Sequence, residues 1–255
     1  MIFVRSNVVR CPAPDEDALH AKWCDDVLRA SPIKHAKHQS FASIIGFQSI
    51  APFVSEIRSP DRLGVVVAGG TQHIGVAWRF VERAFRAGSS MVNPISFPAT
   101  LTSAVPASIA AAVGAHAFAL TIGYDHRALF EAIDRSCLMV RRDYADDVFV
   151  VACTDRRPHP TEAWDETERP SAQEIAVGFH LSRFRSAGRC ILKSFGSGSE
   201  NAPEQTARRI CDEHGMQLSH AMREVEVQGD AISIYSPDGT YRVDLMKTDK
   251  IEDAA

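Results

Sequence analysis

The first residues that could do chemistry follow a strongly apolar segment. Residues 63–68 (LGVVVA) have the length and β-branched composition of a strand buried on both faces, and Gly69 and Gly70 follow them. The segment 75–86 then shows helical periodicity. A strand, a glycine turn and a helix can place backbone N–H groups around a phosphate. We expect a tight strand-to-helix turn here, with a phosphate-binding loop as the alternative.

A second group of polar residues stands between a short predicted strand, 117–121, and a predicted helix, 126–139. Asp125 and His126 are neighbours there, and such a couple can act as a general acid and base. An aspartate at a helix N-terminus also stabilises the helix dipole, which is the simpler interpretation.

Histidine and cysteine residues offer weaker candidates. His35 and His38 are three residues apart on a predicted helix and could hold a metal ion, but the lysines around them favour a solvent-exposed basic face. Cys137 and Cys153 fall in a predicted helix and after a predicted strand, where cysteine usually packs as a small hydrophobic residue. A nucleophile at either cysteine is the alternative. We expect no metal site and no bound cofactor.

The elements that must position these residues alternate between strand and helix. This pattern predicts an α/β fold with a mostly parallel sheet, whose ligands lie beyond the carboxyl ends of the strands. Residues 154–171 are polar and proline-rich, which indicates a surface loop that exposes Trp164. The segments 175–184 and 188–195 are expected to pair as a hairpin. The other predicted elements are helices at 15–29, 34–53, 106–114 and 203–214, and strands at 148–152, 225–235 and 241–246.

Composition limits the class of protein. The chain has 255 residues, with 28 Lys and Arg against 32 Asp and Glu, and a net charge of −4. It is neither disordered nor basic enough to suggest a nucleic-acid partner. The most apolar stretch, 104–122, is interrupted by proline, glycine and histidine, so no membrane span is expected. Scattered cysteines without a C-x-x-C pair, and an N-terminus without a secretory signal, favour a reduced, cytoplasmic protein.

Read as one block, residues 63–155 resemble the N-terminal half of a β-ketoacyl synthase. The resemblance rests on the order of events: a buried strand ending in Gly-Gly, the segment 92–98 (VNPISFP), an alanine-rich helix ending at Gly114, and two further strands. It implies a layered, thiolase-like α/β fold with a mostly parallel central sheet and a truncated C-terminal half. The ketosynthase-like half would cover residues 1–195, and residues 196–255 would form a short α/β extension on the same core.

Gly123 stands where an active ketosynthase carries its catalytic cysteine. Since glycine cannot form a thioester, the chain resembles the cysteine-lacking, chain-length-factor-like subunits of polyketide and fatty-acid-type biosynthesis. The resemblance implies a non-catalytic subunit that pairs with a catalytic ketosynthase and an acyl carrier protein, or forms a homodimer. Phe97 and Tyr124 are candidates for substrate binding. A missing second half should leave an apolar face for a partner, with the alanine-rich segment 104–117 and Phe97 as candidates.

Two alternatives remain open. The first is an enzyme on the same scaffold that acts on an acyl or carrier-protein-bound substrate through Asp125, His126 or another cysteine. The second is a nucleotide binder, because residues 65–75 are similar to the opening fingerprint of short-chain dehydrogenases. His73 replaces a glycine of that fingerprint, and Tyr144 lacks the lysine expected four residues later.

Overall fold

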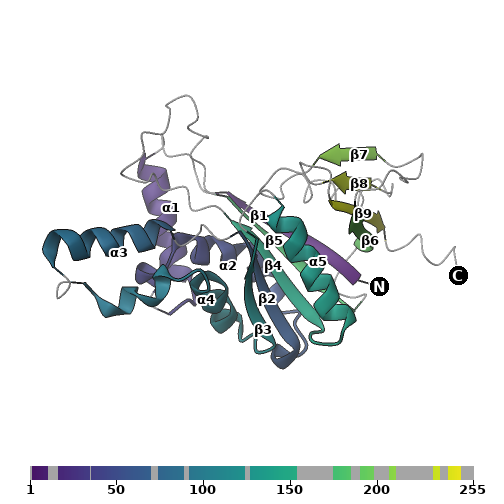
Figure 1. Cartoon of the computed structure of the whole chain (residues 1–255), viewed down its shortest axis with the longest axis horizontal. Helices are drawn as coiled ribbons and strands as arrows, with labels where there is room; N and C mark the ends of the chain where they lie inside the picture. Colours follow the sequence, from purple (N-terminus) through teal and green to yellow (C-terminus); the bar gives the residue numbers. More distant parts are fainter. Residues whose placement is uncertain are drawn as a thin grey trace, which may run out of the picture.

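The computed structural model describes most of the chain (Figure 1). The described ranges are 2–10, 17–34, 36–69, 74–88, 92–123, 127–153, 175–184, 190–197, 207–210, 232–235 and 241–247. The helices are α1 (Asp17–Ala30), α2 (Phe41–Val54), α3 (Ile74–Ala87), α4 (Ala104–Val113) and α5 (Ala128–Arg141). The strands are β1 (Ile2–Arg10), β2 (Leu63–Ala68), β3 (Phe118–Ile122), β4 (Asp147–Cys153), β5 (Ile175–Ser182), β6 (Cys190–Ser197), β7 (Ala207–Ile210), β8 (Ile232–Tyr235) and β9 (Tyr241–Lys247).

One sheet joins all the described strands in the order β3-β2-β4-β5-β1-β6-β9-β8-β7. β2 lies between β3 and β4 and pairs with both in parallel. β5 runs antiparallel to β4 and to β1. The parallel part of the sheet is therefore the β3-β2-β4 end, together with the β7–β8 pair.

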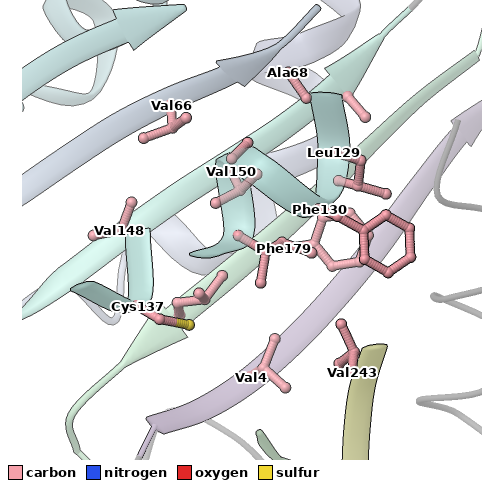
Figure 2. Close-up of a cluster of buried hydrophobic side chains, with 14 of the residues drawn as sticks. Val4, Val66, Ala68, Leu129, Phe130, Cys137, Val148, Val150, Phe179 and Val243 are labelled. Atoms are coloured by element: carbon pink, nitrogen blue, oxygen red, sulfur yellow. The ribbon is translucent and has the colours of Figure 1, made fainter. Parts of the chain in front are cut away.

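Helices cover both faces of the sheet, so the protein has two hydrophobic cores. Successive side chains of β2 and β4 point alternately into one core and the other. Val65 and Val67 point toward α2 and α4, whereas Val66 points to the opposite face, against α5. In Figure 2, the labelled side chains of β1, β2, β4, β5 and α5 gather in this second core, together with Val243 of β9. Burial on both faces is what the uninterrupted apolar runs of β2 and β4 require.

Helix α2 lies close against the sheet. Ser40 caps its N-terminus by accepting a hydrogen bond from the Ala42 N–H, so the helix begins at Phe41 rather than near residue 34 as expected. A Cβ at Gly178 would come 2.5 Å from the Ser49 carbonyl oxygen, so only glycine permits this approach to β5. Asn7 Nδ2 donates to the same carbonyl at 3.2 Å, which ties β1 to the helix.

A network of ion pairs between two arginines and two aspartates lies at the amino end of β2 and β4. Arg62 pairs with Asp143 at 2.7 Å and with Asp146 at 3.0 Å. Arg183, just after β5, pairs with the same two carboxylates at 2.8 and 3.0 Å. It also donates to the carbonyl groups of Val140 and Ala145. The network joins three segments that are distant in sequence.

Three details differ from the sequence-based expectation. The sheet is mixed rather than mostly parallel, because β5, β1, β6 and β9 join it with antiparallel pairings. The segments 175–182 and 190–197 do not form a hairpin, because β1 is inserted between them. Residues 207–210 form strand β7, not part of a helix. The boundary between residues 195 and 196, which lies within the span of β6, stays a prediction.

Among the described residues, no single helix is both long and apolar enough to cross a membrane. The bent pair Pro94–Thr100 and Ala104–Val113 meets that length and composition test only when its two members are taken together.

Candidate functional site

The carboxyl ends of three parallel strands meet at one edge of the sheet. Ala68 of β2 is in register with Ile122 of β3 and with Ala152 of β4. The next residues along these strands are Gly69, Gly123 and Cys153. The Gly69 N–H donates to the Ile122 carbonyl oxygen at 2.9 Å, which holds the two strand ends together. This edge is where an α/β sheet with parallel strands places its ligands.

Gly123 makes the turn between β3 and α5. Its φ is +74°, a left-handed conformation that favours glycine. A Cβ atom built here would lie 2.6 Å from both the Cα and the Cβ of Ala128, in the first turn of α5. No side chain fits at this position without a backbone shift. The position that the resemblance assigns to a nucleophile is therefore closed as well as lacking the cysteine.

Glu131 also reaches this position, and the sequence analysis missed it. Its Oε2 atom lies 3.2 Å from the point where a Cβ of residue 123 would be. Glu131 is in the first turn of α5, where the partial positive charge of a helix N-terminus favours a carboxylate. The signal was the acidic residue one turn after the expected start of the helix.

The other predicted site residues have different outcomes. Tyr124, Asp125 and His126 lie outside the described residues. Phe97 is 53% exposed and its ring packs against Phe80 of α3, with 5.8 Å between the ring centroids. The structure therefore associates Phe97 with α3.

Both cysteines that the sequence offers as nucleophiles are buried in the structure. Cys137 is buried in α5, and burial raises the pKa of its thiol to about 12, so almost none of it is thiolate at neutral pH. Cys153 is buried at the carboxyl end of β4, on the Gly123 edge of the sheet. Its sulfur lies 3.9 Å from the position of a Cβ at Gly46 of α2.

A buried polar pair lies near the amino end of β4, opposite the strand ends at Gly123. His180 Nε2 is 2.9 Å from Asp147 Oδ1, and both side chains are almost fully buried. Phe53 stacks on the imidazole and Phe149 meets it edge-on, at centroid distances of 5.8 and 5.2 Å. Asp147 begins β4, opposite Leu63 at the start of β2. The pair is therefore remote from Gly123, and we interpret it as a polar contact within the core.

The structure describes only part of the residues that could bind a metal ion or a dinucleotide. In the described ranges, no group of three or more His, Cys, Asp or Glu side chains could hold a metal ion. His38 lines a surface pocket, and His35 lies outside the described residues, as do 70–73 of the glycine turn. The antiparallel β5 beside β4 also differs from the parallel, doubly wound sheet that a dinucleotide-binding enzyme uses.

Comparison with known proteins identifies the fold. No protein-family model and no curated protein matches the chain, but solved structures do. One is the ketosynthase ApeO in complex with its chain length factor ApeC from Xenorhabdus doucetiae, with a TM-score of 0.61 and 10% identity. Another is the ishigamide ketosynthase/chain length factor, with a TM-score of 0.66 and 10% identity. In both, the match covers 96% of this chain and 99% of the other.

Two further structures extend this result. AntDE:AntF, a type II polyketide synthase acyl-carrier protein in complex with its ketosynthase, matches with a TM-score of 0.60 and 14% identity over 96% of this chain and 99% of that one. The ketosynthase from module 1 of the bacillaene synthase of Bacillus amyloliquefaciens matches with a TM-score of 0.51, over 89% of this chain and 56% of that one. The chain therefore has the thiolase-like α/β fold of ketosynthases and chain length factors, which confirms the fold predicted from the resemblance.

Proposed function

We propose that this protein is a ketosynthase-like, chain-length-factor-like subunit of polyketide or fatty-acid-type biosynthesis. It does not carry an acyl group at Gly123. It pairs with a catalytic ketosynthase, which receives its substrates from an acyl carrier protein.

The closed position at Gly123 carries this proposal. The left-handed φ and the 2.6 Å approach to Ala128 leave no room for a nucleophilic side chain. Covalent acyl transfer requires an attacking sulfur or oxygen at the substrate carbonyl. A subunit that retains the fold without this group must depend on another chain for the condensation.

Two features support pairing with another chain. Five of the seven large hydrophobic side chains exposed among the described residues lie on α3 or on the adjoining segment 94–101: Val81, Phe85, Ile95, Phe97 and Leu101. We call these five residues the α3 apolar surface. Concentrated exposed apolar side chains mark interaction sites. In the described part of the sheet β3 is a terminal strand paired only with β2, which leaves one backbone edge for a partner strand.

The alanine-rich segment is a smaller part of this surface than expected. In α4, Val105, Ile109 and Ala110 are buried in the core beneath α2 and β2. The outer side of α5 exposes Arg135 and Arg141 besides Leu138. The exposed apolar residues therefore concentrate on α3 and around Phe97.

The lengths of the matched chains also support the proposal. Coverage of 96% of this chain and 99% of the other in both chain-length-factor complexes means that the matched chains are close to this one in length. By contrast, the bacillaene ketosynthase is matched over only 56% of its length.

The test is co-expression with a ketosynthase encoded in the same genome, followed by native mass spectrometry and an elongation assay with malonyl-loaded carrier protein. We expect a one-to-one complex that elongates chains, and no elongation by this protein alone. Light scattering on the purified protein tests the second assembly, a homodimer. A monomer that neither binds the synthase nor changes its products contradicts the proposal.

Glu131 supports a second candidate, an enzyme with a repurposed site on the same scaffold. Its carboxylate lies next to the closed Gly123 position, where an acyl substrate of a ketosynthase would react. Turnover of an acyl thioester by this protein alone, lost on Glu131→Gln and retained by Glu56→Gln, would favour this candidate over the non-catalytic subunit.

A further inference from the structure

A cavity of about 580 Å³ lies along α3, away from Gly123 and Glu131. This open cavity is lined by residues of α3, of the 3₁₀ turn Ala36–His38 and of the segment around the 3₁₀ turn Pro94–Ser96. Figure 1 shows α3 extending away from the sheet, with the chain returning below it toward α4. The volume of the cavity falls within the range of small-molecule binding sites.

Three arginines line this cavity. Arg79, Arg83 and Arg86 belong to α3 at spacings of four and three residues, so they lie along one face of the helix. The only carboxylate among the described lining residues is Glu82, which pairs with Arg86 at 2.8 Å. Within the described ranges no ion pair involves Arg83. The net charge of the whole protein is −4, so this positive cluster is a local feature.

The inner lining of the cavity has a different character. Val76 is buried and Phe80 is half-buried against Phe97, which gives the cavity an apolar floor. Asn93 Oδ1 accepts a hydrogen bond from the Ile95 N–H at 3.0 Å. The Nδ2 group of Asn93 is the hydrogen-bond donor of the same side chain. The cavity thus combines a cationic rim, an amide donor and an apolar floor.

We infer that this cavity binds an organic phosphate, with the phosphate group at the arginine rim and the organic part on the floor of Val76 and Phe80. Guanidinium groups bind phosphate through paired hydrogen bonds. A phosphate has more acceptor oxygens than a carboxylate, so it can engage several arginines at once. The cavity lining alone supports this site, and the proposed pairing with a ketosynthase is not needed for it.

Isothermal titration calorimetry with two matched ligand pairs tests the inference. The pairs are 4′-phosphopantetheine with pantetheine, and AMP with adenosine; each pair differs by one phosphate. We expect the phosphorylated member of at least one pair to bind at least about tenfold more tightly, and this difference to fall as NaCl rises from 50 to 300 mM. Arg83→Gln should remove most of the difference and Arg83→Lys should retain part of it.

Arg135→Gln is the control, because Arg135 is exposed on α5 and does not line the cavity. It should leave both affinities unchanged. Equal affinity within both pairs, no binding in either pair, or equally tight binding of succinate overturns the inference. A loss of affinity in Arg135→Gln as large as in Arg83→Gln also overturns it, because attraction would then come from the overall surface charge.

Discussion

The Cα atom of Ala128 lies 2.6 Å from the position of a side-chain Cβ at Gly123. The first turn of α5 therefore occupies the space that a nucleophilic side chain would need. If the chain had only lost its cysteine, the space for that side chain would still be open. Here the space at Gly123 is filled by Ala128. This close approach predicts that reintroducing the cysteine will not restore acyl transfer.

Gly123→Cys should be destabilised and should form no acyl adduct by intact-protein mass spectrometry. Gly114→Ala and Gly123→Ala separate the two causes of the instability. Gly114 also has a positive φ, +68°, but a Cβ there meets nothing within 4 Å. Gly114→Ala should cost about 1–2 kcal/mol from backbone conformation alone. Gly123→Ala should cost about 1–3 kcal/mol more from steric overlap. Equal costs in urea unfolding would show that the site is open.

The sequence predicts those parts of this site that depend on neighbouring residues in the chain. The strand before Gly123 and the helix after it are recognisable from apolar runs and periodicity, so the turn was placed correctly. The contact with Ala128 and the position of Glu131 depend on how α5 packs on β2 and β4. That packing is a tertiary property, and no spacing of residues along the chain encodes it directly.

Cysteine reactivity tests the alternative that another thiol replaces the missing nucleophile. Because burial raises the pKa of Cys137 to about 12, maleimide at pH 7.5 should not label it in the native protein. Cys24 is partly exposed and serves as the internal control. Peptide mapping should show modified Cys24 in the native protein, and modified Cys137 only in urea. Native labelling of Cys137 at the rate of Cys24 would contradict the buried assignment.

The network around Asp143 predicts a loss of stability in acid. Hydrogen bonds from Arg183 and Arg62 hold the pKa of the Asp143 carboxyl below its ordinary value. A lowered pKa in the folded state stabilises the protein above the unfolded pKa, and this contribution disappears as the pH falls through the folded value. Asp143→Asn should therefore lower the Tm at pH 6, and the difference from the natural protein should shrink below about pH 4.

Asparagine suits this test because the φ of Asp143 is +65°, a conformation that asparagine tolerates. Asp26→Asn, at an exposed position of α1, is the control and should leave the Tm unchanged at both pH values. A Tm difference for Asp143→Asn that stays constant from pH 6 to pH 3 would rule out the electrostatic explanation.

The buried His180–Asp147 pair predicts a coupling between two core substitutions. Replacing either partner leaves the other polar group buried without its 2.9 Å contact, which should cost about 1–3 kcal/mol. The double variant His180→Phe with Asp147→Leu removes both groups and should be more stable than the sum of the single effects allows. Strict additivity in urea unfolding would show that the contact contributes no stability.

The order of the sheet shows where prediction from sequence stops. Apolar runs such as 63–68 and 147–153 predict buried strands, but they do not predict which strands lie beside them in the sheet. The insertion of β1 between β5 and β6 depends on pairings between residues more than 160 positions apart, such as Phe3 with Ser182. The sequence offered segment 188–195 as the neighbouring partner of segment 175–184. The predicted hairpin was wrong, because β1 lies between the two strands.

The α3 apolar surface makes the proposed pairing testable at single residues. Phe85 is 87% exposed and Phe97 is 53% exposed, so replacing either by serine should not disturb the core. If this surface contacts the ketosynthase, each substitution should weaken the complex by about tenfold or more, since buried aromatic residues dominate interface energies. Leu138→Ser, on exposed α5, is the matched control. Unchanged affinity in Phe85→Ser and Phe97→Ser, with a loss in Leu138→Ser, would move the interface from α3 to the outer side of α5.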